Sequence, residues 1–155
     1  MNAYKARSNS IPWPPIITLA AAILAVLAAW VYRLPFPQGA VLQYTGVLLL
    51  IFALAIDIWS IFTMRAAQTT VMPTKGSTHL VTNGPFGYSR NPIYLGNILL
   101  LLALSLILAN AWFVILAAAA AIGMKKLAVD REELHLLAVF GAEYEDYCRR
   151  VRRWL

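Results

Sequence analysis

Four long apolar stretches dominate this chain of 155 residues and limit what it can fold into. They cover about Ile16 to Tyr32, Ala40 to Thr63, Ile93 to Ala109 and Trp112 to Met124. With 61% hydrophobic and only 13% charged residues, the chain differs from soluble domains, which are close to half apolar and a quarter charged. The sequence therefore predicts an all-α, polytopic membrane protein of about four transmembrane helices.

The lengths of these stretches differ. The second is long enough to cross about 30 Å of hydrocarbon with some tilt. The fourth is shorter than the roughly 20 residues that a span usually needs, and it reaches full depth only if Lys125 and Lys126 extend their amines to the interface. Asn110 and Ala111 leave a tight turn between the last two stretches. We therefore expect these two stretches to form an antiparallel helical pair.

Basic residues mark one side of the predicted bundle. Seven of the thirteen lie from Lys125 onward, whereas Arg33 alone lies between the first two stretches. Because Lys and Arg collect in cytoplasmic loops, we expect both termini and the long middle loop in the cytoplasm. Lys5 and Arg7 ahead of an Ala-rich stretch also resemble a signal peptide, but the three later apolar stretches favour a membrane span there.

The middle loop carries a strongly patterned segment, Gly84-Pro85-Phe86-Gly87-Tyr88-Ser89-Arg90-Asn91-Pro92-Ile93-Tyr94-Leu95-Gly96. Asn91 followed by Pro92 predicts a helix start, because Asn caps free amides and Pro suits the first helical position. The amides of that first turn, with Arg90 beside them, suit a carboxylate or phosphate. An ordinary interfacial cap with a headgroup-binding arginine explains the same residues.

Glycines and aromatic residues in this segment also suit a ligand. Gly84 and Gly87 allow turns at which the backbone comes close to a bound molecule. Phe86, Tyr88 and Tyr94 offer flat faces for an adenine-like ring, although an interfacial aromatic belt is the competing interpretation.

A second polar cluster, Asp130-Arg131-Glu132-Glu133, follows the fourth stretch. Two adjacent carboxylates near a membrane face repel each other and cost energy unless they are solvated or paired. A ligand with an ammonium, a sulfonium or ribose hydroxyls would use them. The alternative is an N-terminal capping box, with Asp130 as the cap and Glu133 completing it. Because the helical pair lies between the two clusters, we expect both clusters at one membrane face.

Asp57 is the only acid inside a predicted span. An intramembrane carboxylate is a functional candidate by default, but a structural partner such as Arg65 or a loop amide explains it equally well.

The region from about Asp130 to Trp154 predicts a cytoplasmic amphipathic helix, broken at Gly141, because apolar residues recur at three- and four-residue steps. The arginines of its tail suit anionic headgroups better than nucleic acid in a membrane chain. A single cysteine, Cys148, excludes a disulfide within the chain. His79 and His135 lie far apart without cysteine partners, so we predict no metal site.

Several of these elements form a series. In chain order it contains Gln68-Thr69-Thr70, Leu80-Val81-Thr82-Asn83-Gly84-Pro85-Phe86, Arg90-Asn91-Pro92-Ile93-Tyr94-Leu95-Gly96, Glu132-Glu133, and Phe140-Gly141-Ala142-Glu143-Tyr144 with Tyr147. Over about residues 57 to 154 the chain resembles the membrane methyltransferase superfamily of isoprenylcysteine carboxyl methyltransferases and phospholipid N-methyltransferases. It looks closest to the small bacterial members.

The resemblance implies S-adenosylmethionine as cofactor, held on the cytoplasmic side between the start of the penultimate span and the C-terminal region. Carried over by position or singled out above, the cofactor-binding candidates are Gln68, Leu80, Val81, Gly84, Phe86, Tyr88, Arg90, Asn91, Pro92, Tyr94, Glu132 and Glu133. A basic residue just before the acids, Arg131 or Lys126, is implied to contact substrate. Asn91 stands where the carboxyl methyltransferases carry histidine, so it can hydrogen-bond a ligand but cannot act as a titrating base.

We therefore expect a single membrane methyltransferase domain over residues 1–155, with two spans in 1–64 and the cofactor loop, helical pair and C-terminal helix in 65–155. The hypothesis is S-adenosylmethionine-dependent methyl transfer to a lipophilic acceptor in a bacterial inner membrane, resembling isoprenylcysteine carboxyl O-methylation. Arg131 and Asn91 are then the candidates nearest the reacting groups. The expected partners are the acceptor and membrane lipids, with neither nucleic acid nor an obligate protein partner. The alternatives are a phospholipid amine N-methyltransferase and a non-catalytic lipid-binding protein.

Overall fold

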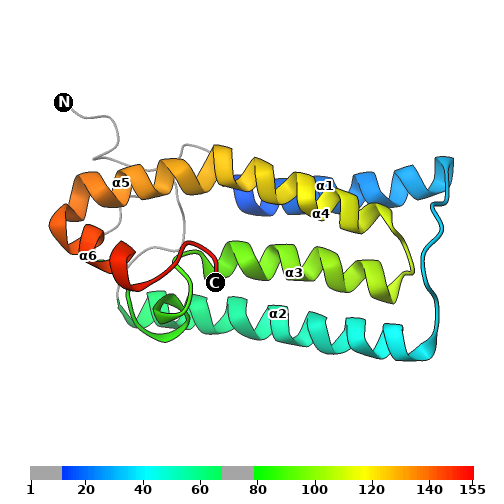
Figure 1. Ribbon diagram of the computed structural model, residues 1–155, viewed down its shortest axis with the longest axis horizontal. Coiled ribbons are helices and arrows are strands. Elements are labelled where there is room, and N and C mark those ends of the chain that lie inside the picture. The colour runs from blue at the N-terminus through cyan, green and yellow to red at the C-terminus, as the bar shows by residue number, and fades with distance from the viewer. Residues whose placement is uncertain (1–11, 68–78) are drawn as a thin grey trace.

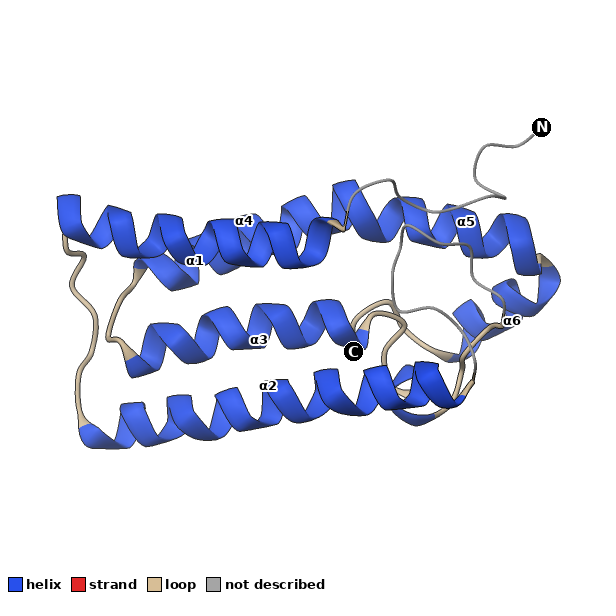
Figure 2. Cartoon of the chain, turned by 180° about the vertical axis from the view of Figure 1, so that it is seen from behind, coloured by secondary structure: helices blue, strands red, loops and turns tan. Residues whose placement is uncertain are grey.

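The computed structural model describes residues 12–67 and 79–155, and these form an elongated helical bundle (Figure 1). Four apolar helices run along its length: α1 Trp13–Val31, α2 Ala40–Ala66, α3 Pro92–Ile107 and α4 Trp112–Met124. A π-helical turn, Lys125–Val129, joins α4 to α5 Asp130–Phe140, and α6 Ala142–Arg150 follows. The described part of the chain contains no strand, as the all-α prediction requires (Figure 2).

Two helix pairs build the body of the bundle. α2 packs along α3, α1 packs along α4, and α3 also contacts α4 and α1. Small residues let the backbones approach closely: a Cβ added at Gly46 of α2 would lie 2.9 Å from Leu106 Cβ on α3. Ala25 of α1 and Ala117 of α4 are almost completely buried. Since lipid tails are as apolar as leucine, such close backbone packing is what associates helices within a membrane.

A tight turn makes α3 and α4 antiparallel, as predicted. The N–H of Trp112 donates a 3.0 Å hydrogen bond to Asn110 Oδ1, and the N–H of Asn110 donates one of 3.0 Å to the carbonyl of Ser105. The start of α3 and the end of α4 therefore lie at the same end of the bundle (Figure 1).

Within residues 12–67 and 79–155, three helical segments are long and apolar enough to cross a membrane: α1, α2 and the continuous helix Ala111–Phe140. α3 is a shorter apolar helix of 16 residues. The fourth stretch is short, as predicted, since α4 has 13 residues. The π-helical turn carries the helix on through Lys125 and Lys126 into α5, which the sequence did not predict. About 20 residues cover the hydrocarbon, so α5 extends beyond it.

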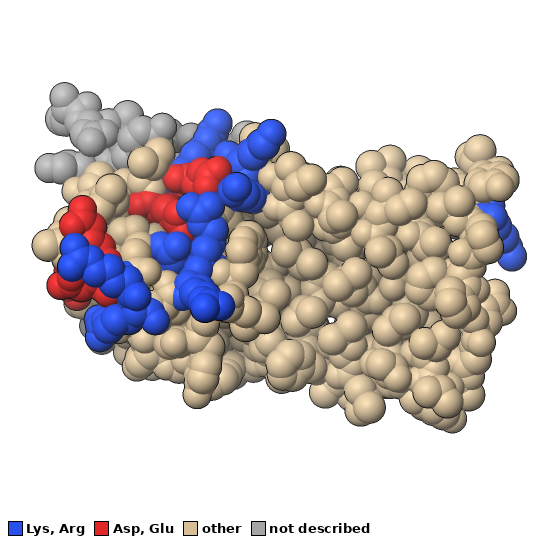
Figure 3. Space-filling view, viewed as in Figure 1, with Lys and Arg blue, Asp and Glu red and all other residues tan. Residues whose placement is uncertain are grey.

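Charged side chains gather at one end of the long axis, over α5, α6 and the C-terminal tail, which comprises residues 151–155 (Figure 3). We call this region the charged end and the rest of the bundle the body. Along the body, large apolar side chains such as Trp30, Val41 and Leu48 are exposed. Exposed apolar surface on this scale is a mark of contact with lipid.

Two predictions for the C-terminal region have opposite outcomes. The break at Gly141 is confirmed: its φ of +54° lies in the region that favours glycine, and it separates α5 from α6. The capping box of Asp130 and Glu133 was wrong. Val129 before them is already helical, so the continuous helix leaves no free amides there to cap.

Candidate functional site

Glycine folds the loop before α3 onto the end of α2. Gly84–Gly87 form one 3-10 turn, in which Gly84 has a φ of +58°. A Cβ at Gly84 would lie 2.9 Å from Thr63 Oγ1, so this close approach also requires glycine. On its other side the turn is fixed to α6, because the Tyr147 hydroxyl donates a 2.7 Å hydrogen bond to the carbonyl of Phe86.

The start of α3 is bonded to the C-terminal tail. Asn91 precedes Pro92 at the first helical position, as predicted, but the Asn91 side chain does not cap the helix. Its Nδ2 instead donates a 3.0 Å hydrogen bond to the carbonyl of Arg153. The N–H of Arg90 donates to the carbonyl of Arg152 at 3.0 Å. The capping prediction fails because the tail brings carbonyl acceptors to these donors.

Glu132 points at the start of α3. The Tyr94 hydroxyl donates a 2.7 Å hydrogen bond to Glu132 Oε2. The π-helical turn before α5 winds more widely than an α-helix, and this keeps Met124, Ala128 and Glu132, at four-residue steps, on the side that faces the bundle. Burial raises the pKa of Glu132, and the hydrogen bond from Tyr94 lowers it only in part. A cation bound beside Glu132 would favour its charged form.

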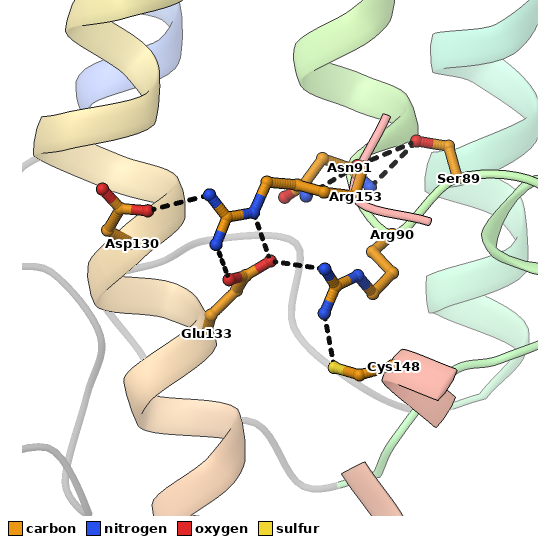
Figure 4. Close-up of polar contacts among 7 residues, drawn as sticks. All are labelled: Ser89, Arg90, Asn91, Asp130, Glu133, Cys148 and Arg153. Atoms are coloured by element: carbon orange, nitrogen blue, oxygen red, sulfur yellow. Dashed lines mark hydrogen bonds and ion pairs between the residues drawn. The ribbon is translucent and has the colours of Figure 1, made fainter. Parts of the chain in front are cut away.

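Glu133 is occupied by two arginines (Figure 4). Arg153 forms a two-pronged pair with it, with Nε at 3.0 Å from Oε1 and Nη2 on Oε2. Arg90 approaches the same carboxylate at 3.5 Å, and Asp130 lies 3.3 Å from Arg153 Nη1. The hydrogen bond with Glu133 raises the pKa of the Arg153 guanidinium. The adjacent glutamates therefore have different partners. Glu132 accepts a hydrogen bond from the Tyr94 hydroxyl, whereas Glu133 lies between the guanidinium groups of Arg153 and Arg90.

Two cavities adjoin at these residues. The first has a volume of about 60 Å³ and lies among α5, α6 and the loop that follows residue 78. The second has about 320 Å³ and lies between the beginnings of α1 and α3. Five residues line both cavities, and we call them the shared wall: Met64, Phe86, Arg90, Asn91 and Glu132. The Nε of Arg90 is buried and has no hydrogen-bond partner among the described residues.

Most of the predicted site residues lie around these cavities. Those that line one or both are Leu80, Val81, Phe86, Arg90, Asn91, Pro92, Tyr94, Glu132 and Glu133. Gly84 instead packs against Thr63 of α2. Tyr88 is 74% exposed and faces an apolar groove with Trp59. Arg131 is exposed and lines neither cavity, and Gln68 lies outside the described residues.

The structure adds residues that sequence reasoning missed. Met64 lines both cavities, and nothing distinguishes it in sequence from other apolar residues of α2. Asn97 lines the second cavity, where its Oδ1 accepts a 2.8 Å hydrogen bond from the Thr18 hydroxyl. Its amide in a predicted span was a usable signal. Arg153 had no such signal, because it stands in a run of arginines.

Asp57 lies apart from both cavities. Its carboxylate is against Gly96 at the interface of α2 and α3, and its buried Oδ1 has no hydrogen-bond partner among the described residues. The structure therefore places this acid in helix packing.

A family model described as phospholipid methyltransferase matches residues 41–143. The matched region runs from α2 through the loop, α3 and α4 to the start of α6, and it contains the shared wall. Neither the curated proteins nor the solved structures include a significant match to the chain. Because the family match covers well over half of the chain, the protein belongs to the phospholipid methyltransferase family of membrane methyltransferases.

Proposed function

We propose that the protein transfers the methyl group of S-adenosylmethionine to a lipophilic acceptor at the membrane surface. In this proposal the first cavity and the shared wall hold the cofactor, and the second cavity admits the acceptor. The observation that carries the proposal is the shared wall itself. Its residues line both cavities, so a molecule in the first cavity and a molecule in the second would both contact these five residues and lie next to each other.

The residues present fit the cofactor. Glu132 supplies a carboxylate for the sulfonium or the ammonium, and the unpartnered Nε of Arg90 suits the cofactor's carboxylate. Leu80, Val81 and Phe86 provide apolar and aromatic surface for the adenine. About 60 Å³ is less than the roughly 300 Å³ of the smallest ligand pockets. The bound cofactor therefore has to extend past the shared wall or widen the first cavity.

The chemistry asks for alignment more than for acid–base catalysis. When bound, S-adenosylmethionine would supply a methyl carbon that a nucleophile attacks in line with the carbon–sulfur bond, and neutral S-adenosylhomocysteine would be the leaving group. The protein's contribution is to orient the two molecules and to exclude water. Asn91 lines both cavities and can orient a ligand by hydrogen bonding, but it cannot take up a proton. Arg131 is left with a role outside the two cavities, such as attraction of anionic headgroups.

The lining of the second cavity favours an amine as the acceptor. Apolar residues from the start of α1, Pro12, Pro14 and Pro15, form one side of it, and Tyr94, Asn97 and Glu132 form the polar part. Glu132 would attract a protonated amine, which has to release its proton to water before it attacks the methyl carbon, whereas Glu132 would repel a carboxylate. We therefore favour a phospholipid amine, giving N-methylation. Carboxyl O-methylation of an isoprenylated acceptor is the second candidate, since the second cavity is largely apolar.

We also propose that the charged end faces the cytoplasm of a bacterial inner membrane, with four crossings and both termini inside. The collection of arginines at that end supports this orientation (Figure 3). α3 would cross with only 16 residues, since it packs on both α2 and α4 in the bundle.

The test is to incubate the purified full-length protein with methyl-labelled S-adenosylmethionine and a membrane lipid extract. The proposal predicts labelled lipid from which mild base releases no volatile methanol, because base does not cleave an N-methyl group. Base-labile label would indicate an ester and favour the second candidate. If the protein neither binds the cofactor nor transfers label, the non-catalytic lipid-binding alternative replaces the proposal. The variant Glu132→Gln removes the charge of the carboxylate on the shared wall and should weaken cofactor binding. Glu145→Gln makes the same change at an exposed residue of α6 and serves as its matched control.

A further inference from the structure

Arg153 is bonded to two separate parts of the fold at once (Figure 4). Its guanidinium holds Glu133 and Asp130 on α5. Its carbonyl accepts hydrogen bonds from Asn91 Nδ2 at 3.0 Å and from the Ser89 hydroxyl at 3.4 Å, beside the start of α3. One residue of the tail thus joins the two elements that enclose the first cavity.

Two polar side-chain contacts join α5 directly to the region where α3 begins. They are the hydrogen bond of Tyr94 with Glu132 and the pair of Arg90 with Glu133. Among the described helices and turns, α5 packs closely on the π-helical turn before it and on α6. Because each polar contact depends on one side chain, the link through Arg153 adds to what sets the separation of α5 from α3.

Arg153 also decides what Arg90 can do. Arg90 already contacts the Cys148 thiol and one oxygen of Glu133, and its Nε remains unpartnered. While Arg153 holds Glu133 by two prongs, Arg90 cannot form a full pair with the same carboxylate. Without Arg153, Arg90 is free to turn onto Glu133, because paired geometry between guanidinium and carboxylate is strongly favoured.

We propose that Arg153 is a positioning residue, which sets the width of the first cavity and keeps Arg90 on the shared wall by clasping α5 to the start of α3. The ligand of the cavity rests on the proposed function, whereas the clasp itself does not. Arg153 lies outside the region that the family model matches, so the inference about Arg153 depends on the contacts in this structure and not on the family match.

The experiment compares Arg153→Gln and Arg153→Lys with Arg152→Gln in the full-length protein. Arg152 is the matched control, since its side chain is exposed and its backbone carbonyl remains. Two experiments are made on each protein. The label-transfer assay gives the KM and kcat for S-adenosylmethionine, and hydrogen exchange is followed over residues 88–95 without cofactor. Exchange reports the clasp directly, because the Arg90 N–H donates to the tail.

Arg153→Gln should raise the KM for the cofactor about tenfold, as expected for loss of a charge-assisted pair, with kcat changed less than about twofold. It should also speed exchange over residues 88–95. Arg153→Lys keeps the charge but not the planar fork, so it should recover part of both effects. Arg152→Gln should match the wild type in both.

An unchanged cofactor KM in an active Arg153→Gln protein would overturn the inference and leave the proposed function intact. If the wild type itself shows no cofactor binding, the proposed function fails and exchange alone decides on the clasp. In that case, unchanged hydrogen exchange in both Arg153 variants overturns the clasp, and faster exchange over residues 88–95 supports it. Should Arg153→Gln fail to fold, Arg153→Lys against Arg152→Gln gives the same readings.

Discussion

The body and the charged end of this molecule are held together by different forces. In the body, α2 and α3 meet where Gly46 and Gly96 let the helices come close. At the charged end, ion pairs of Arg90 and Arg153 join α5 to the segment before α3 and to the tail. Close packing tolerates almost no added atom, whereas ion pairs near water weaken with salt. The cavities lie where the second kind of contact prevails, so the site is the adjustable part of the fold.

The largest expected effect is on the body. A Cβ at Gly96 would overlap Asp57 Oδ1 and lie 2.7 Å from Asp57 Cγ, so Gly96→Ala has to displace the Asp57 carboxylate from its place between α2 and α3. We expect it to lower the free energy of unfolding in detergent by about 3 kcal/mol. Asp57→Ala removes the obstructing carboxylate, and the double variant should therefore recover most of the loss. A double variant no more stable than Gly96→Ala would show that this close contact is not what limits packing.

At the charged end, Glu133→Gln removes the partner that Arg153 and Arg90 share. We expect a loss of about 2 kcal/mol, because two partly buried guanidinium groups are left without their carboxylate. High salt should shrink this difference, since it screens charges near water, while the Gly96→Ala loss stays constant. Equal salt dependence of the two variants in thermal unfolding would remove the distinction between the two regions.

A milder change tests the body again. Gly46→Ala places a Cβ 3.0 Å from the carbonyl oxygen of Ala103, and we expect a loss of about 1 kcal/mol after the gain in helix propensity. Gly123→Ala is the matched control, because its Cβ would lie 3.8 Å from Ile17 in ordinary contact. It should be neutral or slightly stabilising. A loss for Gly123→Ala as large as that for Gly46→Ala would contradict the account.

The smallest effect is a pH dependence of stability. Burial raises the pKa of Glu132 above its ordinary value of 4.5. The unfolded chain therefore releases this proton first as the pH rises, and the contribution of Glu132 to stability is present below pH 4.5 and is lost as the pH passes through the folded-state pKa. Unfolding midpoints measured across this range should fall more for the wild type than for Glu132→Gln. If the unfolding midpoints of the wild type and of Glu132→Gln change with pH in the same way, burial does not raise the pKa of Glu132 as described.

Sequence reasoning succeeded where one local rule decides the structure. The apolar stretches predicted the helices, Asn91-Pro92 predicted the start of α3, and Gly141 predicted the break between α5 and α6. The tight turn at Asn110 then implied that the two polar clusters meet, and the Tyr94–Glu132 hydrogen bond confirms that they do.

Reasoning from sequence failed where distant segments compete for the same groups. Asn91 was predicted to cap α3, but the tail supplies a carbonyl from 62 residues further along the chain. Glu133 was predicted either to bind the cofactor beside Glu132 or to complete a capping box, yet its carboxylate pairs with Arg153 and Arg90. Such choices depend on where the tail returns, and neither helical periodicity nor capping preferences contain that information. The sequence also did not predict that the helix continues from α4 into α5, since a π-helical turn has no clear sequence signal.

The most direct test of the central claim is equilibrium binding of S-adenosylmethionine to the purified protein and to Glu132→Gln, with Glu145→Gln as control. The account predicts saturable binding by the wild type and the control, and at least about tenfold weaker binding by Glu132→Gln in a protein that keeps its helical content. Equal affinity in all three proteins would show that the wall between the two cavities does not hold the cofactor.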